Sequence, residues 1–140
     1  MSDRERRAQM LEAFGDLFGR APTAWVRAPG RVDLMGSHTD YNLCFVMTMT
    51  VDRDIWIALA PREDGRVRIL SLNLGGEGDF GLDAITRDET HPWTNYVRGV
   101  AVELVKAGHA LRGFDALIHS TVPLGSGFGR SPCGLTFPPP

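Results

Sequence analysis

The segment spanning residues 28–41 constrains the chain more than any other part of the sequence. It contains two glycines at which the chain can reverse, a permanently charged Arg31, and four further polar side chains at Asp33, Ser37, His38 and Asp40. A hydrophobic run, residues 43–49, follows directly. A core segment does not need this density of polar groups. A pocket that orients a polyhydroxylated ligand beside an anion does need it, and the segment therefore favours such a pocket.

Composition narrows the class of protein. The chain has 140 residues, of which 43% are hydrophobic, and this fits one globular domain. Fifteen basic and seventeen acidic residues give a net charge of −2, which argues against nucleic-acid and membrane-surface partners. Residues 1–10 are charged and do not resemble a signal peptide. Cys44 and Cys133 match no metal or redox spacing, so we expect reduced thiols, a cytoplasmic location and no metal ligands.

Apolar residues at helical spacing predict two helices. The first covers residues 4–18 and ends at Gly19. Its apolar face is expected to consist of Leu11, Phe14, Leu17 and Phe18. The second covers residues 93–107 and ends at Gly108. Its apolar stripe is expected to consist of Val97, Val100, Ala101, Leu104 and Val105.

Short apolar or alternating runs predict five strands, at residues 23–28, 45–51, 54–60, 66–72 and 114–120. The pair Asp64–Gly65 is a hairpin signal between the third and fourth of them. Residues 75–78 are predicted to be a surface loop. Strands combined with two helices indicate an α+β fold with mixed α/β layers.

A second glycine-rich segment, residues 122–129, follows the last predicted strand. Its three glycines allow backbone N–H groups to converge without obstruction by Cβ atoms, and such a loop can cradle phosphate. A glycine-rich connection is more often only a turn. The segment is not a Walker loop, because no Gly-Lys-Ser/Thr sequence follows it.

Three motifs together carry a family resemblance. Residues 28–42 closely resemble the signature of galactokinases, which are members of the GHMP small-molecule kinases. Residues 123–127 resemble the start of that superfamily's phosphate-binding motif, and residues 93–99 resemble the helix start between the two. The resemblance implies the N-terminal domain of the GHMP kinase fold, which is similar to the ribosomal protein S5 domain 2-like fold. We expect this domain to cover residues 1–129 and to be incomplete at its C-terminal end.

The resemblance implies roles in sugar recognition for the first motif, residues 27–42. Arg31 matches the arginine near the phosphoryl acceptor and is the candidate catalytic residue, although it can instead pair with Asp33 to close a turn. The candidate sugar ligands are Asp33, Ser37, His38 and Asp40. His38 can alternatively be a turn-capping residue, and Tyr41 and Asn42 are expected to position the loop.

The resemblance also implies an ATP-binding role for the second motif. The candidate residues are Pro123, Leu124, Gly125, Ser126, Gly127, Phe128 and Gly129, together with Trp93, which matches a position close to the adenine. Simple packing on the core is an equally good interpretation of Trp93. ATP with Mg²⁺ is the expected co-substrate, and protein ligands for Mg²⁺ are not expected within this chain.

The sequence departs from the family pattern at three places. Ser37 stands where galactokinases usually carry Glu, and Asp33 stands where they commonly carry Asn. These two differences leave the identity of the sugar substrate open. After Gly127 the family loop continues as Leu-Ser-Ser-Ser-Ala, whereas this chain reads Phe128-Gly-Arg-Ser-Pro-Cys133. Residues 130–140 are expected to be disordered, and the three closing prolines cannot continue a helix. The hypothesis is a galactokinase N-terminal portion, truncated or frameshifted inside the ATP loop.

The resulting functional hypothesis is ATP-dependent phosphorylation of galactose at its anomeric hydroxyl, giving galactose 1-phosphate, with the isolated chain inactive. Exposed apolar surface is expected to favour self-association. The alternatives are a non-catalytic sugar-binding regulator, a kinase for another sugar, and a small α/β domain whose glycine-rich loops are only turns.

Overall fold

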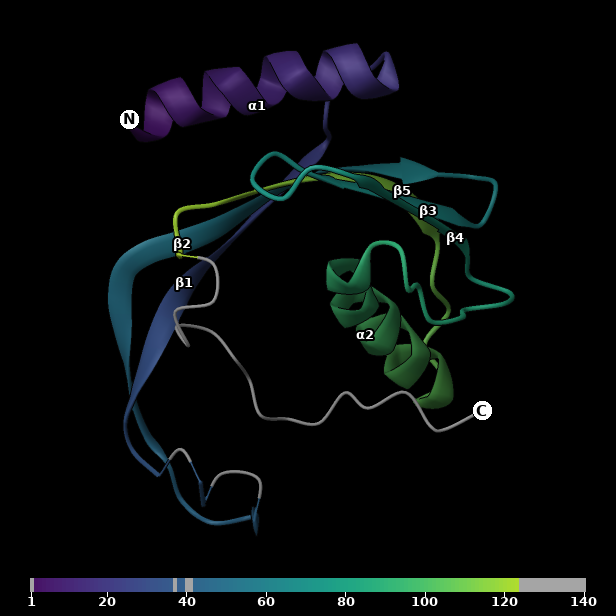
Figure 1. Ribbon diagram of the computed structural model, residues 1–140. Helices are drawn as coiled ribbons and strands as arrows, with labels where there is room; N and C mark the ends of the chain where they lie inside the picture. The colour runs from purple at the N-terminus through teal and green to yellow at the C-terminus, as the bar shows by residue number, and fades with distance from the viewer. Residues whose placement is uncertain (1, 37, 40–41, 124–140) are drawn as a thin grey trace.

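A computed structural model describes residues 2–36, 38–39 and 42–123. It contains a five-stranded sheet, in the order β1-β2-β5-β3-β4, with helix α1 on one face and helix α2 on the other (Figure 1). The elements are α1 (Asp3–Phe18), β1 (Ala24–Met35), β2 (Met47–Arg62), β3 (Arg66–Ser71), β4 (Glu77–Gly81), a 3₁₀ turn (Pro92–Thr94), α2 (Asn95–Lys106) and β5 (Gly113–Ser120). The predicted α+β class is confirmed.

The sheet is mixed, with three antiparallel strand pairs and one parallel pair among the described strands. β2 pairs antiparallel with β1 and β5, and β4 pairs antiparallel with β3. Among the described strands, only β3 and β5 run parallel, because the chain returns to β5 through β4 and α2. β5 pairs with β2 from Ile55 to Arg62, so within the described part of the chain the first half of β2 pairs with β1 alone. The β1–β2 ribbon therefore extends beyond the rest of the sheet (Figure 1).

Two apolar clusters form the core, one on each face of the sheet. Alternation along β2 separates them, since successive side chains of a strand point to opposite faces. The α1 side buries Met10, Phe14, Ala58, Ala60 and Leu117. The α2 side buries Val67, Ile69, Phe80, Ala101 and Ala116, with Ile57 and Leu59 packed against them.

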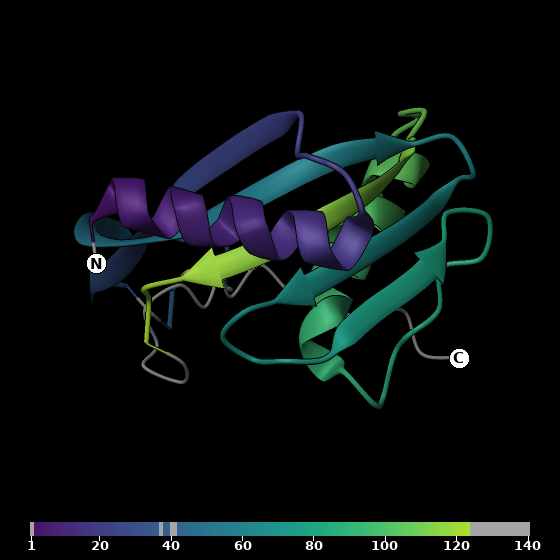
Figure 2. The same ribbon diagram turned by 90° about the horizontal axis from the view of Figure 1, so that it is seen from above.

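Helix α1 lies across the sheet (Figure 2), and both of its ends are capped. Ser2 and Glu5 form a capping box, and Gly19 ends the helix with φ of 66°, as predicted. The prediction of the buried face was partly wrong. Leu11 and Leu17 are each 41% exposed, whereas Met10 and Phe14 are fully buried.

Helix α2 begins two residues later than predicted, after the 3₁₀ turn that contains Trp93, and Gly108 follows it with φ of 85°. The predicted apolar stripe is only partly buried. Ala101 packs into the core, whereas Val100, Leu104 and Val105 are between 38% and 48% exposed. Arg98 takes a buried place on the inner face because its guanidinium finds polar partners there.

Strands β1 and β2 are longer than predicted. β1 continues through Pro29 and Gly30, so Gly30 lies in extended chain and does not reverse it. Pro29 is tolerated because β1 is an edge strand, and the register shifts at a bulge opposite Gly30, where β2 has two more residues than β1. The two strands predicted at 45–51 and 54–60 are one strand, since Asp54 is buried and paired inside it.

The prediction of a surface loop at residues 75–78 was wrong for residues 77 and 78. Residues 77–81 form β4, which pairs with β3 along the sheet edge. Only Phe80 and Gly78 of this strand are buried, and ion pairs from Arg66 to Asp79 and from Arg68 to Glu77 connect the outer face. A strand held in this way has little apolar periodicity in its sequence.

Candidate functional site

The outer half of the β1–β2 ribbon carries two of the predicted site residues. Arg31 and Asp33 lie on β1 beyond the bulge, opposite Thr50 and Thr48 of β2. Two residues apart on a strand, they lie on the same face. Arg31 Nε is 3.9 Å from Asp33 Oδ1, and the two side chains are 38% and 19% exposed. This contact joins neighbours along a strand and does not close a turn.

Asp33 has an unusual environment for a carboxylate. Its Oδ1 atom is buried and receives no hydrogen bond from the part of the chain that the structure describes. A buried acceptor of this kind costs free energy unless a donor reaches it. The Asp33 side chain as a whole is 19% exposed beside the Arg31 cation, so part of its carboxylate remains accessible from solvent.

The loop between β1 and β2 is held together by its backbone. Gly36 has φ of 96°, and a Cβ added there would lie 2.7 Å from the carbonyl oxygen of Phe45, so only glycine fits. Asn42 Nδ2 donates to the carbonyl oxygen of His38 at 2.9 Å. Asn42 thus positions the loop, in agreement with the prediction for it. His38 itself lies on the surface.

Several predicted site residues lie outside the described residues. They are Ser37, Asp40, Leu124, Gly125, Ser126, Gly127, Phe128 and Gly129, as well as the tail 130–140. Their proposed roles stay predictions. The described part of the second motif is its beginning, at Val122 and Pro123.

The structure brings the beginning of the second motif against the first. A Cβ added to Gly30 would lie 3.0 Å from Val122 Cγ2 and 3.2 Å from the carbonyl oxygen of Arg53. Gly30 thus allows Val122 to approach β1 directly beside Arg31. The first and second motifs, which are about ninety residues apart in the chain, therefore lie next to each other at Gly30 and Val122.

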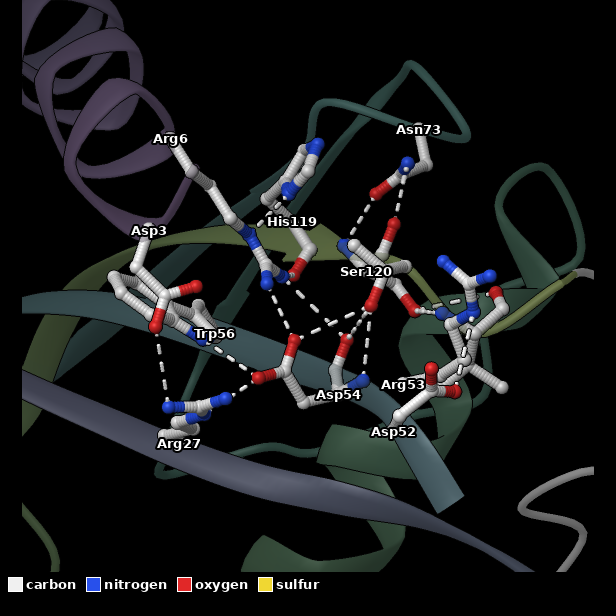
Figure 3. Close-up of polar contacts among 12 residues, drawn as sticks. Asp3, Arg6, Arg27, Asp52, Arg53, Asp54, Trp56, Asn73, His119 and Ser120 are labelled. Carbon is white, nitrogen blue, oxygen red and sulfur yellow. Dashed lines mark hydrogen bonds and ion pairs between the residues drawn. The ribbon is translucent and has the colours of Figure 1, made fainter. Parts of the chain in front are cut away.

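A buried polar cluster around Asp54 holds this junction together (Figure 3). Asp54 is 6% exposed and accepts hydrogen bonds from Arg6 of α1, Arg27 of β1 and the indole Nε1 of Trp56. The Thr121 amide donates to the Asp54 carbonyl oxygen at 2.9 Å, and the Asp54 amide donates to Thr121 Oγ1 at 2.9 Å. The cluster thus ties α1, β1 and β2 to the end of β5.

The same cluster sets the charge states of its members. Burial alone would raise the Asp54 pKa, but the hydrogen bonds from Arg6, Trp56 and Arg27 lower it to about 2. Burial and the nearby Arg6 charge lower the pKa of His119, whose Nδ1 accepts from Arg6 Nε at 2.6 Å. Asp54 is therefore ionised at neutral pH, and its negative charge compensates the positive charge of the Arg6 side chain beside it.

Sequence reasoning missed this cluster. The only signal for it was the position of Arg6, four and eight residues before the buried Met10 and Phe14 on the same helix face. An arginine on the buried face of a helix requires an acceptor beneath it. The identity of that acceptor depends on sheet pairing, which the sequence does not state.

Residues 93–99, the remaining motif that resembles galactokinases, contain the 3₁₀ turn and the first residues of α2. Trp93 packs against the α2-side core, and its Nε1 is buried with no hydrogen-bond partner among the described residues. Asn95 exchanges two hydrogen bonds with the backbone of Asp88, and Arg98 forms an ion pair with the Asp88 carboxylate at 3.1 Å. Asn95 and Arg98 therefore fix the loop before α2. The packing interpretation of Trp93 fits its contacts.

The described residues contain neither a membrane-spanning helix nor a cluster of metal ligands. Within 2–36, 38–39 and 42–123, no helix is long and apolar enough to cross a membrane. The same residues contain no group of three or more His, Cys, Asp or Glu side chains that could hold a metal ion.

Comparison with known proteins places the chain in a class. Residues 12–61 match the model of the galactokinase galactose-binding signature. The crystal structure of Methanococcus jannaschii mevalonate kinase superposes with a TM-score of 0.59 at 18% identity, over 76% of this chain and 35% of that one. The fold is therefore that of the GHMP kinases.

Two closer similarities define the family more narrowly. A galactokinase of Chloroflexus aurantiacus is 49% identical over 122 residues, which are 87% of this chain and 31% of that protein. Lactococcus lactis galactokinase in complex with galactose has a TM-score of 0.75 and 32% identity, over 88% of this chain and 33% of that one. The chain is thus a relative of the galactokinases and corresponds to their N-terminal portion. It spans about a third of the length of the curated relatives it matches.

Proposed function

We propose that this chain supplies the sugar-recognition portion of a galactokinase-type kinase, which transfers the γ-phosphoryl group of ATP to the anomeric hydroxyl of galactose. The observation that carries the proposal is the galactose-binding signature at residues 12–61, folded into the extended β1–β2 ribbon with Arg31 and Asp33 on one face. The likeness to a galactokinase in complex with galactose supports it.

The described residues suggest how recognition is divided. The Asp33 carboxylate, whose side chain is 19% exposed, accepts a hydrogen bond from a sugar hydroxyl, and His38 can donate or accept one. Arg31 carries a permanent charge at the same face and stabilises negative charge on a phosphoryl group arriving at the sugar. Ser37 and Asp40 stay candidate sugar ligands.

The nucleotide side of the proposal rests on the Gly30–Val122 contact, which starts the glycine-rich segment beside Arg31. Residues 123–129 are proposed to contact the ATP phosphates, and Trp93 is proposed to lie near the adenine. The described residues contain no group of side chains that could hold Mg²⁺. The cytoplasm is the proposed location, and self-association through exposed apolar residues is a further expectation.

A chimera tests this function. The aligned 122 residues of this chain replace their counterpart in the Chloroflexus aurantiacus galactokinase, and galactose 1-phosphate formation from ATP is measured. We expect galactose-dependent turnover that falls about 100- to 1,000-fold in Arg31→Ala, the usual cost of removing a donor that stabilises transition-state charge. A folded chimera that phosphorylates no sugar would contradict the proposal. Unchanged turnover in Arg31→Ala would remove the role of Arg31 alone.

The 140-residue chain by itself is expected to show negligible kinase activity, because phosphoryl transfer requires many groups to act together. A non-catalytic sugar-binding role is therefore the alternative for the isolated chain. Galactose binding without ATP hydrolysis would favour this alternative. Glucose and pentose controls in the same assay decide whether Ser37 has changed the sugar.

A further inference from the structure

The hydroxyl of Thr39 lies at the point where the two ends of the β1–β2 loop meet. Its Oγ1 atom is 3.0 Å from the carbonyl oxygen of Gly36 and 3.0 Å from that of Phe45. Gly36 follows the last residue of β1, and Phe45 precedes β2, so one hydroxyl proton is shared between the two sides of the loop. The close approach of these sides is the reason why residue 36 must be glycine.

The backbone of Thr39 completes the closure. Its amide donates to the Gly36 carbonyl oxygen at 3.0 Å, and its carbonyl oxygen accepts from the amides of Asn42 and Cys44, each at 3.0 Å. Asn42 in turn holds the carbonyl oxygen of His38. The main chain at residues 38–39 is therefore fixed from both directions, and Thr39 makes most of these contacts.

We propose that Thr39 is a positioning residue for sugar recognition, whose hydroxyl closes the loop and, together with Asn42, fixes the main chain that presents His38. The inference rests on the proposed function, since it assigns a role within the same sugar site. Thr39 does not have to contact the sugar. Its side chain is directed to the two loop carbonyls, which a methyl group of the same shape cannot bind.

Three variants of the full 140-residue chain test the proposal. Thr39→Val removes the hydroxyl and keeps the shape, whereas Thr39→Ser keeps the hydroxyl and rescues the contact. Thr90→Val is the matched control, because Thr90 is exposed and its side chain makes no hydrogen bond among the described residues. Amide hydrogen exchange by NMR reports loop closure at Asn42 and Cys44, and titration with galactose reports the dissociation constant.

We expect the amides of Asn42 and Cys44 to exchange about fivefold faster in Thr39→Val, the effect of losing one ordinary hydrogen bond. Core amides of β3 should be unchanged. Galactose should bind about fivefold more weakly, whereas Thr39→Ser and Thr90→Val should stay within twofold of the original chain. This pattern separates positioning from general stability, because only the loop and the sugar respond.

Two results would overturn the inference. If both loop amides keep their original exchange rates in Thr39→Val, the hydroxyl does not close the loop. If the loop loosens but galactose binds with unchanged affinity, closure does not position the sugar ligands. A chain that leaves galactose unbound before any substitution refutes the proposed function instead, and the exchange rates still decide whether Thr39 closes the loop.

Discussion

Replacing Asp54 should destabilise the chain more than replacing any exposed carboxylate near it. The Arg6 and Asp54 side chains are only 4% and 8% exposed, and Asp54 also accepts from Trp56 and Arg27. Removing one partner of a buried pair leaves the other charge buried without compensation, at a cost of about 3 to 5 kcal/mol. Arg6 retains the backbone oxygen of His119 as an acceptor, so we expect about 3 kcal/mol for Asp54→Ala.

The pH dependence of stability gives a second measure of the same interaction. A pKa difference of one corresponds to about 1.36 kcal/mol. Lowering the Asp54 pKa from 3.8 to about 2 therefore stabilises the folded chain by about 2 kcal/mol. The pKa is lower in the folded state, so this contribution is fully present above about pH 4. It is lost as the pH falls toward 2. Asp54→Asn should remove this part of the acid sensitivity.

Urea unfolding followed by circular dichroism between pH 2 and pH 7 measures both effects. Asp52→Asn is the matched control, because Asp52 lies two residues before Asp54 and its side chain is 90% exposed. Among the described residues, its carboxylate forms one ion pair, with Arg53 at 3.6 Å. It should change the free energy of unfolding by less than about 1 kcal/mol. Equal stability of Asp54→Ala and Asp52→Asn at pH 7 would refute the account of the cluster.

Further substitutions test the packing of the sheet and of the loop before α2. Gly113→Ala should lower the free energy of unfolding by about 2 to 3 kcal/mol, because its Cβ would lie 2.4 Å from the Arg66 carbonyl oxygen, whereas Gly15→Ala in open space should raise it by about 0.5 to 1 kcal/mol. Equal unfolding curves would contradict this. Arg98→Met should cost about 2 kcal/mol, because it removes the ion pair to Asp88 and the donor to the Thr86 carbonyl oxygen, and a thermal melt unchanged from that of the original chain would show that these hydrogen bonds contribute little.

The sequence predicted the elements whose signals are local. Gly19 and Gly108 end helices in the left-handed conformation, and Gly65 makes the hairpin turn with φ of 67°. Such signals depend on one residue and its neighbours. The parallel pairing of β3 with β5 and the edge strand β4 depend on distant segments, and they could not be predicted in the same way.

The sequence offers candidate site residues but not their supporting contacts. Arg31, Asp33 and His38 are candidates because permanent charge and hydrogen-bonding capacity are visible in the sequence, and their roles stay predictions. Thr39 and Asp54 were missed because their importance depends on which atoms surround them. The sequence alone does not show that two backbone carbonyl oxygens lie beside the Thr39 hydroxyl. Nor does it show that the buried Arg6 lies beside the Asp54 carboxylate.

The central claim is that the β1–β2 ribbon and its loop recognise galactose. An NMR titration of the ¹⁵N-labelled chain with galactose, with glucose as the control sugar, tests it most directly. We expect saturable shift changes for galactose that are confined to residues 31–42, around the Asp33 carboxylate and the loop that Asn42 holds. Shift changes spread over the core strands, equal changes with both sugars, or none with galactose would contradict it.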